Sequence, residues 1–297
     1  MPRPLYRPPR LRRAFFRGSD ALQTGLLTPD QLRTNAWRKV FRDVYVDSSV
    51  PESYELRCRA VRLLLPEGAA VTGRSAACLD GVPIGEPNDL VQVIAPSGTR
   101  WARRGCTLTR TSWLPAEHVV PGVVPRTIPL RTAWEIASGP NLVEAVVDLD
   151  VVFRSGRPSR EALDAWVGAN PESQAALAIG LADPLAESPQ ESRTRVRLVL
   201  AGFPPPTSQH ELWFEGRFVA RFDLSWLAAK VAVEYDGMWH GEGGQISKDR
   251  ARLNRINEAG WEVLFVTRDQ LREPELFALF CDQLRRALAR RGVACSK

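Results

Sequence analysis

The sequence lacks any apolar run near the roughly 18 residues that a membrane-spanning helix needs. Its N-terminus is rich in Arg and Pro and has no apolar core of the signal-peptide type. This pattern predicts a protein without membrane contact. We therefore expect a cytoplasmic location.

Cysteine and histidine patterns typical of disulfide or zinc proteins are also missing. The five cysteines are scattered, odd in number and form no CxxC pair, so we expect reduced thiols. The three histidines, His118, His210 and His240, lie far apart and show no zinc-ligand spacing. The sequence therefore predicts neither a disulfide framework nor a zinc site.

The composition, with 44% hydrophobic and 25% charged residues, is that of an ordinary globular protein. A chain of 297 residues is long enough for two or three domains, each with its own core. Ten of the 40 basic residues but only five of the 34 acidic ones lie in residues 1–53. Such a basic segment can follow a phosphate backbone, although arginine is abundant throughout the chain. The basic residues assigned to this arm are Arg10, Arg12 and Arg13.

A short helix is predicted at residues 28–31, because Thr28 suits an N-cap, Pro29 the first helical position and Gln31 the third. Apolar residues then alternate with basic ones up to a strand-like run at 44–46. We interpret residues 1–53 as a winged helix whose basic helix enters a major groove; an amphipathic helix with a solvated face is the alternative. The basic residues of that helix are Arg38, Lys39 and Arg42.

Residues 25–32 and 41–46 resemble the N-terminal winged helix of AbiEi-type antitoxins from type IV toxin–antitoxin systems. That family usually has Gly before the final Val-Tyr, where this chain has Asp43. The resemblance implies a DNA-binding domain at 1–53.

The middle region, residues 54–182, is predicted to be a mixed α+β domain without a catalytic constellation. Its tryptophans are expected in cores or interfaces. The expected elements are helices at 54–65, around 75–79 and after 131, and strands at 90–95 and 106–109.

The last domain, residues 183–297, is predicted to be a mixed sheet flanked by helices, because a hairpin feeds a third strand and a crossover helix leads to a fourth. Gly202 and Gly260 should end the two helices that precede them. The expected order is helix 189–201, strands 211–214, 217–224 and 230–236, helix 246–259, strand 261–267 and helix 269–290.

Two carboxylates, Asp223 and Glu234, fall in neighbouring apolar strands of this domain. An acid inside such a run must be desolvated unless a cation, a donor or water meets it. Mg²⁺ prefers a few oxygen ligands and keeps several waters. The pair is therefore a candidate metal site.

The order of elements resembles the PD-(D/E)XK nuclease superfamily, and most closely its very-short-patch-repair-like (Vsr-like) branch. The resemblance implies a restriction-endonuclease-like fold in which Asp223 and Glu234 hold Mg²⁺ or Mn²⁺ and Glu191 supports them. Alternatives stay open. Asp223 could cap a strand end or pair with Arg221, and Glu234 could pair with an Arg on a neighbouring strand. Glu191 could complete a capping box with Ser188 or pair with Arg195. The segments that carry the resemblance are residues 189–193, 221–224, 233–240, 249–252 and 259–263.

Asp236 shares a strand face with Glu234 and stands where the superfamily usually has its catalytic Lys. His240 is assigned to act on water, as the Vsr-like resemblance implies, with Lys230 and Lys248 as alternative cations. Lys248 and Arg252 are also assigned to DNA contact. For Arg252 an ion pair with Asp249 at i, i+3 is the alternative.

We therefore predict a multidomain α/β protein that binds duplex DNA and hydrolyses phosphodiester bonds as a metal-dependent endodeoxyribonuclease, in DNA repair or in defence against phage or mobile elements. The alternative is a non-catalytic type IV antitoxin or transcriptional regulator with a degenerate nuclease fold, which the missing Lys favours. A homodimer and a cognate toxin both stay open as partners.

Overall fold

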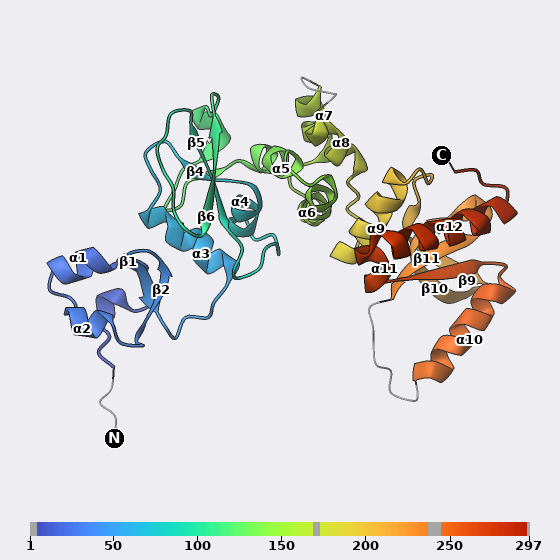
Figure 1. Cartoon of the computed structure of the whole chain (residues 1–297), viewed down its shortest axis with the longest axis horizontal. Coiled ribbons are helices and arrows are strands. Elements are labelled where there is room, and N and C mark those ends of the chain that lie inside the picture. The colour runs from blue at the N-terminus through green and yellow to red at the C-terminus, as the bar shows by residue number, and fades with distance from the viewer. Residues whose placement is uncertain (1–4, 169–172, 237–244, 296–297) are drawn as a thin grey trace. The chain divides into compact units, whose positions relative to one another are not determined.

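The computed structural model describes residues 5–168, 173–236 and 245–295 (Figure 1). Its contacts divide the chain into two compact units. Unit 1 comprises Met1–Ile136 and Ser155–Gly168, and unit 2 comprises Ala137–Arg154 and Ala169–Lys297. Both units combine helices with sheets, as predicted for a multidomain α/β protein. None of the described helices is both long and apolar enough to cross a bilayer.

Unit 1 contains a three-stranded sheet of order β1-β3-β2 and a five-stranded sheet of order β6-β5-β4-β8-β7. Its elements are η1 (Pro9–Leu11), β1 (Phe16–Arg17), α1 (Gly18–Gln23), α2 (Pro29–Leu32), β2 (Trp37–Phe41), β3 (Val44–Asp47), α3 (Tyr54–Ala60), η2 (Val61–Leu63), β4 (Ala70–Val71), α4 (Gly73–Leu79), β5 (Val91–Pro96), β6 (Cys106–Thr111), η3 (Ala116–His118), β7 (Val119–Val120), β8 (Arg126–Thr127), α5 (Pro129–Ala137, ending at the boundary) and α7 (Arg160–Val167).

The predicted capping box is confirmed. The Thr28 side chain accepts from the Gln31 N–H at 3.2 Å, and the Gln31 side chain accepts from the Thr28 N–H at 2.9 Å. These contacts satisfy donors that the helix itself leaves free. The helix they begin, α2, is only four residues long.

The predicted basic helix is wrong, because Arg38 and Lys39 lie in strand β2 and Arg42 lies in the turn to β3. The register between the two strands shifts between Lys39 and Phe41. A β-bulge of this kind inserts one residue, so the apolar residues recur with a spacing that resembles a helix. Asp43 takes the left-handed conformation (φ 64°), which glycine adopts most readily.

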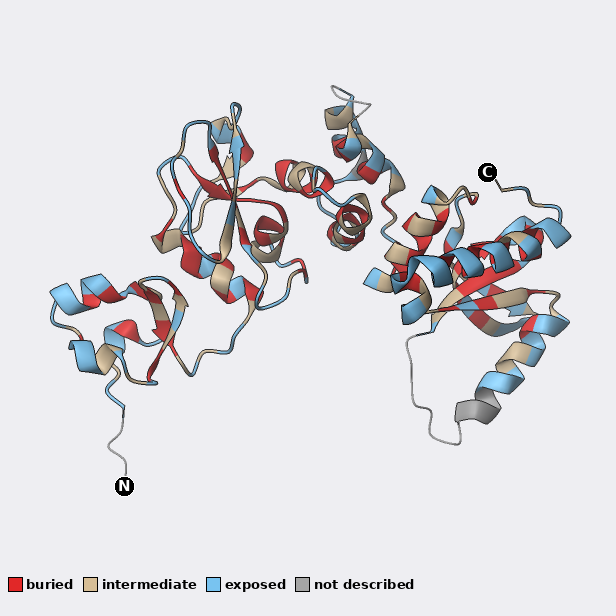
Figure 2. Ribbon diagram, in the orientation of Figure 1, coloured by how far each residue is buried: buried red, intermediate tan, exposed pale blue. Residues whose placement is uncertain are grey.

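The hairpin β2–β3 and the larger sheet of unit 1 share one core. Phe41 and Val44 of the hairpin belong to the same buried cluster as Val61, Val93 and Trp101. Figure 2 colours the buried residues of the ribbon red. Residues 1–53 therefore share a core with the part of the middle region that belongs to unit 1, whereas residues 137–154 and 169–182 of that region belong to unit 2. The division at residue 53 stays a prediction.

Unit 2 is built on a four-stranded sheet of order β12-β11-β10-β9. β9 pairs antiparallel with β10, β10 antiparallel with β11, and β11 parallel with β12. Its elements are α6 (Leu142–Arg154), α8 (Gln174–Leu181), α9 (Pro189–Leu200), β9 (Thr207–Phe214), β10 (Arg217–Trp226), η4 (Leu227–Ala229), β11 (Val231–Asp236), α10 (Gln245–Glu258), β12 (Glu262–Thr267), α11 (Arg268–Arg272) and α12 (Pro274–Arg290).

Helices cover both faces of this sheet. Leu198 of α9 and Leu284 of α12 pack on one face, against Val231 and Val233 of β11. Ile256 of α10 packs on the other face, against Ala232. The mixed sheet flanked by helices is therefore as the sequence predicted.

Two helix ends in unit 2 depend on a glycine and on a proline. Gly260 has φ 80°, and the next residue, Trp261, donates its N–H to the Ile256 carbonyl at 3.1 Å, which is the C-cap that the sequence predicted. The single helix predicted at 269–290 is wrong, because it breaks into α11 and α12 at Glu273. Glu273 precedes Pro274 and is extended, as the proline ring requires.

Candidate active site

Strands β10 and β11 separate where the two predicted carboxylates lie. The pairing begins with Trp226 opposite Val231 and ends with Leu224 opposite Val233, one residue short of Asp223 and Glu234. Beyond that point the Asp223 carboxylate, through Oδ2, accepts from the Tyr235 backbone N–H at 2.9 Å. The Asp223 carboxylate thus takes the place of a backbone carbonyl as the acceptor of the Tyr235 N–H. This hydrogen bond holds the carboxylate where the two strands separate.

The neighbouring strand β9 is distorted at the same level. The antiparallel register pairs Phe222 with His210 and Leu224 with Ser208 but leaves Gln209 without a partner residue. Gln209 has φ 53°, a conformation that non-glycine residues rarely adopt. This geometry lets its Nε2 donate to Glu191 Oε2 at 2.8 Å.

Glu191 is a buried acid, 8% exposed, in the first turn of α9. Its N–H donates to the Ser188 hydroxyl at 3.2 Å, while its Oε2 accepts from the Glu187 N–H at 2.9 Å. The helix start is therefore capped as a capping box would be, with the Glu side chain reaching one residue further back. An ion pair with Arg195 is not formed, because Arg195 pairs with Asp150 at 2.8 Å.

The Asp223 carboxyl is half-buried, and its pKa is raised to about 6. Burial is the main cause, the Tyr235 N–H opposes it, and the nearby charges of Glu191 and Glu234 raise the pKa further. The three predicted acids, from α9, β10 and β11, are therefore close enough to interact electrostatically. A cation placed among them would favour the ionised form of Asp223.

Glu234 already has a cation beside it. Its side chain is 12% exposed, and Arg252 of α10 donates to both carboxylate oxygens, with Nη1 3.1 Å from Oε2. This bidentate contact raises the pKa of Arg252, because the hydrogen bonds favour the charged guanidinium. The alternative ion pair between Arg252 and Asp249 is not formed in the described part of the chain, and Asp249 is exposed.

Arg221 is not a partner of Asp223, since its Nη2 donates to Glu187 Oε2 at 2.6 Å. Lys230 lies in the turn just before β11, at the far end of the strand from Glu234, about 13 Å away for four residues of chain. Its ammonium donates to the Ala259 carbonyl at 3.3 Å. Lys230 is therefore not the compensating cation of this site.

Asp236 is exposed at the end of β11, where it pairs with Thr267 of β12. His240 lies outside the described residues. Lys248 lies in α10, but its side chain is outside the described part of the chain. Their assigned roles stay predictions.

The ligand chemistry of the site suits a divalent cation in part. Asp223 and Glu234 offer hard oxygen ligands, and the raised pKa of Asp223 marks a position where positive charge is favourable. Both oxygens of Glu234 are occupied by Arg252, so one must be released first. Within residues 5–168, 173–236 and 245–295 no group of three His, Cys, Asp or Glu residues lies close enough to hold a metal.

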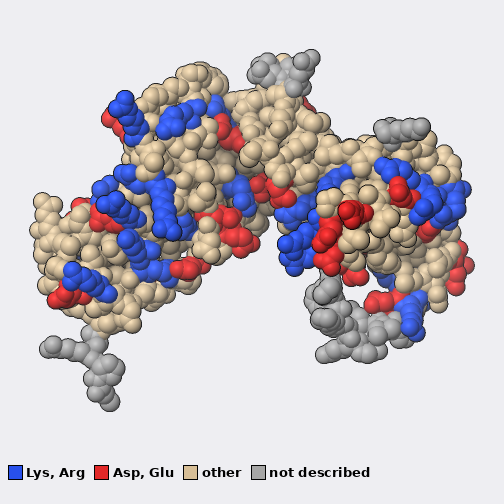
Figure 3. Space-filling view, in the orientation of Figure 1, with Lys and Arg blue, Asp and Glu red and all other residues tan. Residues whose placement is uncertain are grey.

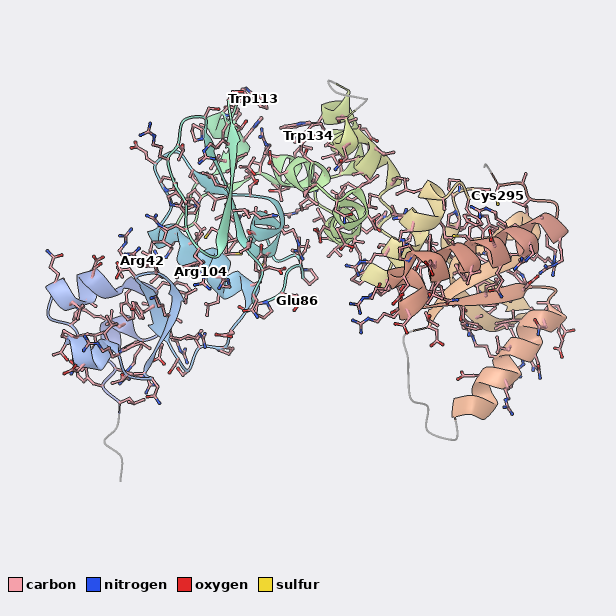
Figure 4. All side chains as sticks on the ribbon, viewed as in Figure 1. Arg42, Glu86, Arg104, Trp113, Trp134 and Cys295 are labelled. Carbon is pink, nitrogen blue, oxygen red and sulfur yellow. The ribbon has the colours of Figure 1, made fainter. Side chains whose placement is uncertain are left out.

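The basic residues assigned to DNA contact in unit 1 are mostly exposed. Lys39 and Arg42 face solvent. Figure 4 labels Arg42 and Arg104, two exposed arginines of unit 1. Arg38 is instead tied down, with Nε 3.2 Å from Glu52 and Nη2 2.6 Å from the Val50 carbonyl. The other assigned residues, Arg10, Arg12 and Arg13, are exposed on the segment around η1.

Gln209 is the site residue that sequence reasoning missed. The sequence around Gln209 contains no motif that marks it as a functional residue. Its left-handed backbone conformation is seen only in the structure. The pairing of Arg252 with Glu234 was missed for a similar reason, because the two residues are 18 positions apart on different elements.

The raised pKa of Asp223 predicts a pH dependence of stability in chelator. The folded value, about 6, exceeds the ordinary 3.8, so the folded protein holds this proton more tightly than the unfolded chain does. Stability therefore falls as pH rises from about 4 to about 6, by about 1–2 kcal/mol after allowance for partial exposure. Urea unfolding of wild type and Asp223→Asn from pH 4 to 8 measures the difference; curves that stay parallel would contradict the shift.

Comparisons with known proteins identify relatives for part of the chain. Two uncharacterized proteins of Mycobacterium tuberculosis, Rv2248 and MT2308, are each 30% identical to it over 154 residues. The matches cover 50% of this chain and 57% of each relative. The chain therefore spans little more than half the length of these relatives. No family model matches the chain.

One solved structure shows a distant likeness. The crystal structure of the RV2827C protein from Mycobacterium tuberculosis aligns with a TM-score of 0.38 and 17% identity. The alignment covers 68% of this chain and 84% of that one. A likeness of this size adds nothing to the argument about function.

Proposed function

We propose that unit 2 is a metal-dependent nuclease of the PD-(D/E)XK type and that the whole chain acts on duplex DNA. The observation that carries the proposal is that Asp223, at the opening between β10 and β11, lies close enough to Glu191 and Glu234, from two other elements, for their charges to raise its pKa. A half-buried acid whose pKa is raised by burial and by neighbouring acids, as that of Asp223 is, is typical of functional sites. Asp223 and Glu234 also lie just beyond the last paired residues of β10 and β11.

The topology of unit 2 supports the same proposal. A helix precedes a hairpin, an antiparallel third strand and a parallel fourth strand reached through α10. This is the order that the resemblance to the superfamily implies. The sheet therefore offers the expected framework for the acids.

Each residue has a definite task in such a site. Asp223 and Glu234 would hold Mg²⁺, which when bound supplies an activated water and neutralises charge developing on phosphorus. Glu191, fixed by Gln209 and the Glu187 N–H, keeps negative charge beside Asp223. Arg252 holds Glu234 in place before substrate arrives and offers a bidentate fork that also suits a phosphate.

A second function is favoured by one observation, the Asp236 that stands in place of the superfamily's catalytic Lys. A regulator or type IV antitoxin would keep the fold and the DNA contacts without turnover. In that case the Arg252–Glu234 pair would be a permanent structural contact. The two functions differ in whether the purified protein cleaves DNA.

The deciding experiment incubates purified protein with supercoiled, linear, mismatched and single-stranded DNA, in Mg²⁺, in Mn²⁺ or in chelator. The nuclease proposal expects cleavage of duplex DNA only with metal. Binding of duplex without cleavage of any substrate in either metal would replace it with the regulator.

A further inference from the structure

A hollow of about 420 Å³ in unit 1 is lined by arginines from three separate parts of the chain. They come from the segment after η1, from α3 and η2, and from β8. Apolar side chains, among them Phe15 and Val124, form its floor. We call this surface the arginine hollow and define it by Arg13, Arg59, Arg62 and Arg126.

Only half of these charges are neutralised. Arg59 pairs with Glu55 at 2.6 Å, one helical turn away, and Arg126 pairs with Asp80 at 2.5 Å. Within the described part of the chain Arg13 and Arg62 have no carboxylate partner. The hollow therefore keeps an excess of positive charge and two guanidinium groups whose donors are free for an anion.

Arg13 is held in an unusual conformation. Its φ is 59°, in the left-handed region that non-glycine residues rarely adopt. The segment is fixed on both sides, by the buried Leu11 and by Phe15 packed on the core of unit 1. Strain that the surrounding packing maintains is a marker of functional positions. Here it directs an arginine to the rim of a basic hollow.

The basic surface continues beyond this hollow. A second hollow of about 490 Å³ is lined by Trp101, Arg103, Arg104 and Arg110. Helix α3 links the two, because its Arg57 donates to the Gly105 carbonyl at 3.3 Å while its Arg59 lines the first. Lys and Arg side chains gather on the face of unit 1 seen in Figure 3. A long polyanion fits such a run of arginines better than a single small anion does.

We propose that the arginine hollow binds the phosphate backbone of duplex DNA, with Arg13 and Arg62 donating directly to phosphate oxygens. The proposal deepens the proposed function, since it rests on DNA as the substrate of the chain. Contacts of this kind position a protein on the duplex and read no bases. Through these contacts unit 1 can bind DNA without inserting its short helix α2 into a groove.

The test is binding of the full chain to a labelled duplex in chelator, across a series of salt concentrations. The variant is Arg13→Gly with Arg62→Gln, in which glycine accepts the left-handed backbone at position 13. Two lost phosphate contacts should reduce the slope of log affinity against log salt by about 2, and affinity near 0.1 M salt by tens of times. Arg286→Gln, at an exposed arginine of α12 outside the hollow, is the control for loss of one surface charge and should leave the slope unchanged.

Each outcome of this binding experiment either supports or overturns the proposal. A wild-type slope in the double variant, with its melting temperature unchanged, overturns the proposal, and so does an absence of duplex binding by wild type. Arg62→Lys should keep most of the slope, because the charge remains. A reduced salt slope in the double variant supports DNA binding by the arginine hollow even if no substrate is cleaved in either metal. The binding proposal and the nuclease proposal can therefore fail separately.

Discussion

Asp223→Asn is expected to lower the rate of Mg²⁺-dependent cleavage by a factor of about 10³ or more. The substitution keeps the size of the side chain and leaves an oxygen that can accept from the Tyr235 N–H, so the opening between β10 and β11 persists. It removes the negative charge that would hold the metal. Metal stabilisation of the transition state contributes several kcal/mol, and each 1.36 kcal/mol is about tenfold in rate.

The matched control is Asp282→Asn, the same chemical change at an exposed residue of α12 that pairs with Arg285 at 3.0 Å. Single-turnover cleavage at pH 7.5, with circular dichroism of each variant, measures the effect. We expect Asp282→Asn to cleave at the wild-type rate. Full activity of a well-folded Asp223→Asn would remove Asp223 from the metal site.

Asp150→Ala is expected to destabilise unit 2 by about 3–5 kcal/mol, the usual effect of breaking a buried ion pair. Asp150 of α6 is completely buried, and Arg195 of α9 is 7% exposed. The carboxylate also accepts from the Asp183 N–H at 2.7 Å. Burial raises the pKa of Asp150 although Arg195 opposes this. Removing the acid leaves Arg195 charged and buried without a counterion.

The same two helices supply the control. Glu144 of α6 and Arg193 of α9 form a bidentate pair, but their side chains are 47% and 32% exposed. Glu144→Gln should therefore change the free energy of unfolding by only about 0–1 kcal/mol. Urea unfolding of both variants measures the contrast, and equal losses would show that burial does not set the strength of these pairs.

A large part of unit 2 could be predicted from the sequence because its signals are local. The glycine stops at 202 and 260, the turn at Glu215 and Gly216 and the alternation in β11 each depend on a few neighbouring residues. The positions of Asp223 and Glu234 followed from that alternation. Their meeting with Glu191 required the tertiary arrangement, which spacing alone does not give.

The errors have physical causes of the same kind. A bulge between Lys39 and Phe41 gave strand β2 the apolar spacing of a helix. The partner of Arg252 was sought on its own helix, at Asp249, whereas the structure provides Glu234 on a strand. In both cases a contact distant in sequence overrides a local pattern.

The core shared by the β2–β3 hairpin and the larger sheet of unit 1 limits how DNA contacts can be mapped by deletion. Removing residues 1–53 would take away Phe41, which is 4% exposed, and Val44, which is fully buried. The remaining sheet would present an apolar surface to water. A truncated protein could then lose DNA affinity because it aggregates and not because its arginines are gone. Single side-chain substitutions in the intact chain avoid this ambiguity.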